Sequence, residues 1–73
     1  MNPRFSLQLT EDLNETLQSA LRNYGIVNVP VLAEQIRQRN EAENVALEDI
    51  AEHLLTKAQA LSAAMIFDSP QLN

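Results

Sequence analysis

The sequence predicts a mainly helical fold in which a short N-terminal strand precedes two helices and a third, C-terminal helix. Three observations lead to this prediction. Beyond residue 10, apolar residues recur every three or four positions, as they do along amphipathic helices. Gly25, the only glycine, follows the first apolar stripe, where a residue that terminates a helix is expected. Before residue 10, apolar and polar residues alternate strictly, which is the period of a half-buried strand.

The alternation covers residues 4–9. Phe5, Leu7 and Leu9 would share one face of a strand, and Arg4, Ser6 and Gln8 the other. A single strand leaves its backbone N–H and C=O groups without partners, so it has to pair with another strand. We expect that partner to be the same segment of a second copy. Two paired copies would expose their polar faces together on a two-stranded ribbon.

The first helix is expected to span roughly 11–24. Thr10 is a suitable N-cap, and Glu11 lies in the first turn, where the helix dipole favours an acidic side chain. Gly25 lies just past the last residue of the apolar stripe, at the position where a left-handed residue ends many helices.

The second helix is expected over about 29–40, with Asn28 as its N-cap and Pro30 in its first turn. We interpret residues 26–29 as a loop, because four residues before a proline make a poor strand. The alternative is that they form a second strand, parallel to residues 5–9, with the first helix as the crossover.

The third helix is expected to be the longest, from about 46 to 67, after a polar hinge at 40–44. Its apolar residues alternate spacings of four and three, which is a heptad pattern. The seam consists of Leu47, Ala51, Leu54, Ala58, Leu61 and Met65. Two interpretations stay open: the seam packs against the chain's own helices, or it forms a surface for another subunit or another protein.

The charge of the chain is divided unevenly. Residues 1–40 carry equal numbers of basic and acidic side chains, whereas residues 41–73 carry six acids and a single base, Lys57. The net charge of −5 therefore belongs entirely to the second half. Such asymmetry suggests either two different roles or one role and a solubilising segment.

Several functional classes find no support in the composition. There is no cysteine and one histidine, so we expect neither a disulfide nor a protein-bound metal. His53 lies four residues after Asp49, and we interpret this pair as solvated. Nothing resembles a catalytic constellation or a glycine-rich phosphate loop, so we expect no enzyme and no cofactor. No apolar run approaches the length of a membrane span, and we expect a cytoplasmic protein.

Residues 3–13 contain an alternating segment, a capping residue, an acidic pair and the start of an apolar helix, in that order. Apolar residues and the glycine continue the pattern at Leu17, Leu21, Gly25, Leu32 and Ile36. Over residues 3–39 this arrangement resembles the Arc-type ribbon-helix-helix repressors. The resemblance implies an intertwined dimer that reads operator DNA with the exposed residues of its paired strands.

In this sequence the resemblance places the base contacts at Arg4, Ser6 and Gln8. Arginine and glutamine can each make paired hydrogen bonds to a base edge in the major groove. The resemblance also places a DNA phosphate near the backbone amides of Asn28 and Val29. Further phosphate contacts are expected from Arg22, Arg37 and Arg39, because these side chains are basic.

The sequence therefore predicts a homodimeric, sequence-specific DNA-binding regulator. Residues 1–40 would dimerise and bind double-stranded DNA, and the acidic helix within residues 45–69 would set a dimer or tetramer or bind a protein partner. By analogy with ribbon-helix-helix antitoxins, that partner would be a toxin. The alternative is a small acidic helical interaction module, similar to an antitoxin or an adaptor, with no direct DNA role.

Overall fold

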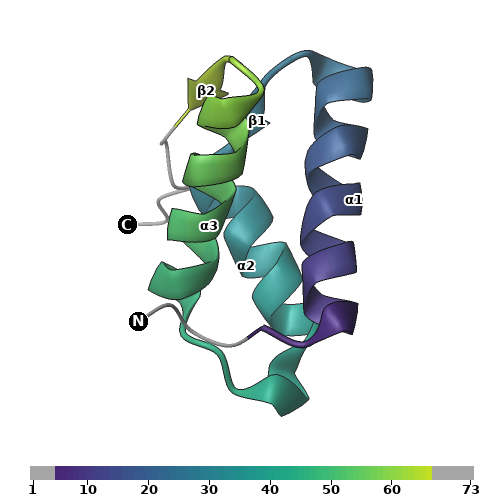
Figure 1. Cartoon of the computed structure of the whole chain (residues 1–73), viewed down its shortest axis with the longest axis vertical. Helices are drawn as coiled ribbons and strands as arrows, with labels where there is room; N and C mark the ends of the chain where they lie inside the picture. Colours follow the sequence, from purple (N-terminus) through teal and green to yellow (C-terminus); the bar gives the residue numbers. More distant parts are fainter. Residues whose placement is uncertain (1–4, 67–73) are drawn as a thin grey trace, which may run out of the picture.

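The structure is a computed structural model that describes residues 5–66. It is mainly helical, as the sequence predicts, with three α-helices and a short 3₁₀ turn between the last two (Figure 1). The helices are α1 (Leu7–Tyr24), α2 (Val29–Arg39) and α3 (Leu47–Ala60). The 3₁₀ turn is η1 (Glu41–Glu43), and the two-residue strands are β1 (Val27–Asn28) and β2 (Met65–Ile66).

The predicted N-terminal strand is wrong over the residues that the structure describes. Helix α1 begins at Leu7, and its N-cap is Ser6, whose Oγ accepts a hydrogen bond from the N–H of Leu9 at 3.0 Å. Thr10 is therefore inside the helix and caps nothing. Without an extended segment at residues 7–9, the expected two-stranded ribbon and its pairing to a second copy have no basis in this fold.

The alternation of residues 4–9 was misleading because Phe5 and Leu9 also fit the period of a helix that continues to Leu17. Leu9, Leu13 and Leu17 are spaced by four residues, and all three are buried. Phe5, four residues before Leu9, is partly buried and packs against the same core. Leu7, which a strand would place on the same face as Leu9, is 74% exposed. A spacing of four continued over several turns is the stronger signal, since residues i and i+4 share one helix face.

The end of α1 and the start of α2 agree with the prediction. Gly25 has φ +70° and ends α1 in the left-handed conformation, and its N–H donates to the carbonyl of Leu21. Asn28 caps α2 by accepting a hydrogen bond from the N–H of Val31, and Pro30 lies in the first turn. Residues 27–28 do form a strand, but they pair in parallel with β2 and not with residues 5–9.

Helix α3 ends at Ala60, seven residues before the predicted end at 67. The N–H of Ala63 donates to the carbonyl of Ala58, and the N–H of Ser62 donates to that of Gln59. Ser62 has φ +55°, so these bonds complete the Schellman arrangement, usually built around a glycine. The chain then turns back to place β2 beside β1 (Figure 1).

All three helices contribute to one hydrophobic core. Its buried residues are Leu9, Leu13, Leu17, Val27, Val29, Ala33, Ile36, Ile50, Leu54 and Ala58. Helices α2 and α3 run in opposite directions and pack closely against one another, and α1 stands beside them, running in the same general direction as α3 (Figure 1). The core is therefore completed within one chain.

The predicted heptad seam does not form a single helix face. Leu54 and Ala58 are buried in the chain's own core, where Ile50 and not Leu47 continues their stripe. Met65 is outside the helix, in β2. Leu61 is 49% exposed, just beyond the end of α3. The structure supports the first of the two interpretations for the centre of the seam, which packs against α1 and α2 of the same chain.

Candidate interaction surfaces

Several hollows on the described surface are large enough to hold side chains of another molecule. One of them, of about 470 Å³, is lined entirely by polar and charged residues: Gln8, Glu11, Asp12, Glu15, Arg39 and Asn40. Two others are grooves between helices. The α1–α2 groove, of about 730 Å³, lies between helices α1 and α2. The α2–α3 groove, of about 330 Å³, lies between α2 and α3, and none of its lining residues belongs to α1. The two grooves differ in the chemistry of the side chains that line them.

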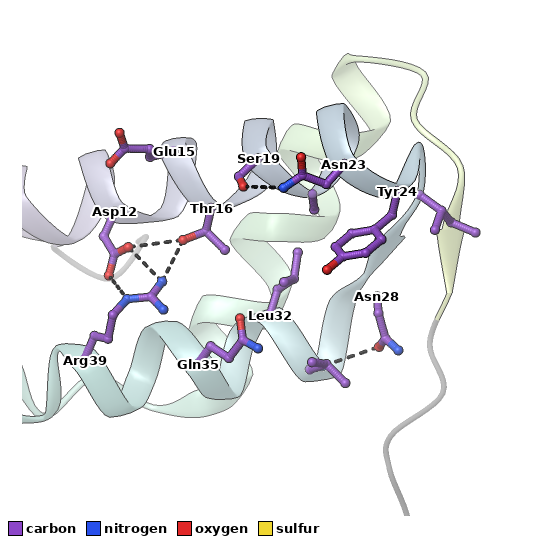
Figure 2. Close-up of a pocket in the computed structure, with 13 residues that line it drawn as sticks. Asp12, Glu15, Thr16, Ser19, Asn23, Tyr24, Asn28, Leu32, Gln35 and Arg39 are labelled. Atoms are coloured by element: carbon purple, nitrogen blue, oxygen red, sulfur yellow. Dashed lines mark hydrogen bonds and ion pairs between the residues drawn. The ribbon is translucent and has the colours of Figure 1, made fainter.

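A polar cluster closes one end of the α1–α2 groove (Figure 2). The guanidinium of Arg39 donates from Nε and Nη2 to the two carboxylate oxygens of Asp12, at 3.0 and 2.8 Å, and from Nη2 to Oγ1 of Thr16 at 2.7 Å. Asn40, the buried polar residue of the described chain, donates from Nδ2 to Asp12 and to the carbonyl of Ile36. This cluster fixes the end of α2 against α1.

The charge of Asp12 is stabilised by this arrangement. Burial of the carboxyl raises its pKa, but the hydrogen bonds from Arg39 and Asn40 and the positive charge of Arg39 outweigh burial, so the pKa lies below its ordinary value. The Asp12 carboxylate accepts hydrogen bonds from Thr16, Arg39 and Asn40 of the same chain. Asp12 is therefore a structural residue that joins two helices.

The other end of the α1–α2 groove is more apolar. Figure 2 shows Tyr24 reaching from the end of α1 over the space in front of Leu32 and Asn28. Tyr24 is 77% exposed, whereas Leu32 and Ile26 are half-buried. Neutral polar side chains, among them Ser19 and its donor Asn23, form the α1 wall. This groove is therefore mixed in character along its whole length.

The α2–α3 groove is apolar throughout. Its lining consists of Val29, Pro30 and Ala33 from α2 and of Leu47, Glu48, Ala51, Glu52 and Leu55 from α3. Ala33 from α2 and Ala51 from α3 have the smallest side chains of the set, so they leave space between the two helices. Leu47 and Leu55 are exposed or half-buried beside them. Both glutamates belong to α3, are exposed, and contribute only apolar atoms to the wall.

The charge around the α2–α3 groove is predominantly negative. Glu48, Asp49 and Glu52 lie in the first half of α3, and Glu41 and Glu43 lie in the turn before it. Lys57, in the last turn of α3, is the one basic side chain in the described residues after position 40. A molecule that approaches this face therefore meets an acidic field.

The N-terminal end of α1 is attached to the same acidic turn. The hydroxyl of Ser6 donates to Oε2 of Glu43 at 2.5 Å, and the ring of Phe5 packs against the ring of His53 with a centroid distance of 4.6 Å. His53 therefore packs against an aromatic ring and does not simply extend into solvent beside Asp49. Within residues 5–66, no group of three or more His, Asp or Glu side chains is placed to hold a metal ion.

The structure does not bring the predicted base-contact residues onto one extended edge. Arg4 lies outside the described residues. Ser6 is the N-cap of α1, and Gln8 is exposed in the first helical turn. Neither Ser6 nor Gln8 belongs to a strand, so the expected reading of bases by alternate strand residues is not possible with this backbone.

The predicted phosphate contacts are dispersed or already engaged. Asn28 uses its side chain to cap α2, and Val29 is buried. Arg37 pairs with Glu34 at 2.6 Å, and the hydrogen bond and charge of Glu34 raise the pKa of Arg37. Arg39 is held by Asp12. Arg22 is exposed in the last turn of α1.

Comparison of the chain with protein-family models, with curated proteins and with solved structures finds no match. Among the residues that the structure describes, no helix combines the length and the apolar character needed to cross a bilayer. The features of the described residues that bear on function are therefore the grooves between the helices and the charges beside them.

Sequence reasoning missed the α2–α3 groove, although part of its signal was present. Leu47 and Ala51 were predicted to belong to an apolar seam that another protein could cover. Val29 and Ala33 are four residues apart and therefore share a face of α2, but this spacing does not identify the element opposite. Only the antiparallel packing of α2 on α3 shows that these two short apolar stripes form the walls of one groove.

Proposed function

We propose that this protein is a small acidic interaction module that binds a helical segment of another protein in its α2–α3 groove. The observation that carries this proposal is the apolar lining of a groove that stays open to solvent after the chain has completed its own core. An exposed apolar groove with a polar surround is typical of a protein-binding surface.

The dimensions of the groove favour a helix that inserts a few side chains. A volume of about 330 Å³ accommodates a small number of apolar groups, and the groove follows the line between two antiparallel helices. An amphipathic helix presents apolar side chains at i, i+4 and i+7 along one line, which matches such a groove. The partner helix would then lie against α2 and α3, as helices do in bundles.

A second copy of this chain is the less suitable occupant. A symmetric interface brings the same patch of both copies together. Here that would place Glu48 and Glu52 of one copy close to the same residues of the other, and like charges at an interface oppose association. Homodimerisation, which was expected together with the ribbon, stays a prediction that light scattering on the pure protein tests.

DNA binding also stays a prediction, but it needs a surface other than the expected ribbon. Nucleic acid is bound through clusters of basic side chains on one face. In this fold the basic residues of α2, Arg37 and Arg39, each have an acidic partner in the same chain. A titration with random duplex DNA at two salt concentrations tests this function, because phosphate contacts weaken as salt rises.

The proposed function is tested with a synthetic helical peptide that carries leucines at i, i+4 and i+7 and is otherwise uncharged. The peptide is titrated into the full-length protein labelled with ¹⁵N, and the amide resonances are followed. We expect the largest shifts at Ala33, Leu47, Ala51 and Leu55. Shifts confined to the α1–α2 groove around Tyr24, or no binding of the peptide, would contradict the proposal.

A further inference from the structure

We infer that the helix recognised by the α2–α3 groove is cationic, with lysine or arginine beside its apolar stripe. This inference rests on the proposed function and adds the chemical class of the partner. The relevant feature is the position of Glu48 and Glu52, which line the α3 edge of an otherwise apolar groove.

The two glutamates follow the groove in register with its apolar residues. Leu47, Ala51 and Leu55 are spaced by four along α3, and Glu48 and Glu52 are each one residue further along the same helix. Residues i and i+4 share a helix face, so the two glutamates occupy a row of positions beside the apolar row. A docked helix would therefore meet an apolar strip and a negative strip side by side.

The surroundings leave that negative strip largely uncompensated. Asp49 adds another carboxylate to the first turns of α3, and Lys57 is located in the last turn of the helix. On α2, the charges of Glu34 and Arg37 are paired with each other at 2.6 Å. Within residues 5–66, neither Glu48 nor Glu52 forms a salt bridge or a side-chain hydrogen bond, so both carboxylates are available to a partner's basic side chains.

A cationic amphipathic helix satisfies both strips at once. Its apolar side chains enter the groove, and basic residues on one flank reach the two carboxylates. Charges at the edge of an interface contribute modestly to affinity, but they raise the association rate and select against partners of the wrong sign. The groove thus provides the contact area, and the glutamates provide the specificity.

The test uses three peptides that share one leucine stripe and carry flanking lysines, glutamines or glutamates. Binding to the full-length protein is measured by calorimetry at about 50 mM and about 500 mM salt, a range over which exposed charges become screened. We expect the lysine peptide to bind about tenfold more tightly than the glutamine peptide at low salt, and the advantage to shrink at high salt. The glutamate peptide is expected to bind least.

A charge-reversed variant tests the assignment to these two residues. In Glu48→Lys/Glu52→Lys, the preference is expected to reverse, so that the glutamate peptide binds more tightly than the lysine peptide. The matched control is Glu11→Lys/Glu15→Lys, which changes the net charge equally at two exposed residues of α1 that are also four apart. This control is expected to keep the preference for the lysine peptide.

The outcomes separate the inference from the proposed function. If all three peptides bind the groove equally, and the reversed variant behaves like the original protein, the groove is a helix site without charge selection and this inference is wrong. If the control variant reverses the preference as well, the net charge of the protein and not the groove edge determines which peptide binds more tightly, and this also overturns the inference. If no peptide binds, the proposed function itself is contradicted.

Discussion

Asp12 and Arg39, twenty-seven residues apart, join α1 to the end of α2 through two parallel hydrogen bonds of 2.8 and 3.0 Å. A planar guanidinium matches a carboxylate in this two-fold geometry better than a lysine ammonium does. Asn40 shares the same carboxylate from its buried position. The contact fixes how the first helix lies against the other two, and therefore the shape of the α1–α2 groove.

The contact between Asp12 and Arg39 makes the free energy of unfolding depend on pH. Because the pKa of folded Asp12 lies below its unfolded value of about 3.9, its contribution is present above that value and is lost as the pH falls through the folded pKa. We expect Asp12→Asn to lower the free energy of unfolding at pH 7 by about 1 kcal/mol, a modest figure because Arg39 is half exposed.

Urea unfolding followed by circular dichroism, between pH 7 and pH 2, checks this prediction. The stability curves of the original protein and of Asp12→Asn are expected to approach each other below about pH 4. The Glu34–Arg37 pair, whose contacts hold the pKa of Glu34 below its ordinary value, remains in both proteins and provides a common acid response. Parallel curves over the whole range would show that Asp12 contributes no pH dependence.

The N-cap at Ser6 gives a second prediction. Replacing it with alanine removes the acceptor for the N–H of Leu9 and the hydrogen bond to Glu43, so Ser6→Ala is expected to lower stability by about 1 kcal/mol. Ser19→Ala is the matched control, because Ser19 lies inside α1 and accepts only a side-chain bond from Asn23. The control is expected to unfold at the original urea concentration. Equal effects of the two changes would contradict a helix that begins at Leu7.

The intramolecular packing of α3 gives a third prediction. Leu54→Ala removes a fully buried side chain from the core and is expected to cost about 2 to 5 kcal/mol, a large share of the stability of so small a domain. Leu61→Ala, at a residue that is half exposed, is expected to change stability little. Thermal unfolding at several protein concentrations measures both. Were Leu54 part of an interface between subunits, the loss would vanish or reverse as the concentration changes.

The sequence was sufficient to predict those parts of the fold that depend on short-range chemistry. Gly25 ends α1, and Asn28 with Pro30 begins α2, because left-handed caps and side-chain caps are local devices with characteristic residues. The end of α3 was missed because Ser62 takes the position where glycine is usual, within an alanine-rich stretch that resembles continued helix.

The larger error concerned residues 5–9, where two periods agree with the same apolar residues. Phe5 and Leu9 are four residues apart and fit a helix, whereas Leu7 fits only the period of a strand. Leu7 therefore favoured the strand, but in the structure its side chain is exposed. The α2–α3 groove could not be predicted for a different reason. It is lined by residues of two helices, among them Ala33 and Ala51, and the pattern of one helix contains no information about the residues of the helix opposite.

The binding of a partner helix in the α2–α3 groove can be tested with one pair of variants. Leu47→Gln changes an exposed leucine inside the groove, and Leu61→Gln changes a similarly exposed leucine outside it. Binding of the lysine peptide is measured for both. We predict that Leu47→Gln weakens binding about tenfold or more, as loss of a contact at the centre of an interface does, while Leu61→Gln leaves it unchanged. Equal affinities of the two variants for the peptide would show that the helix does not bind in the α2–α3 groove.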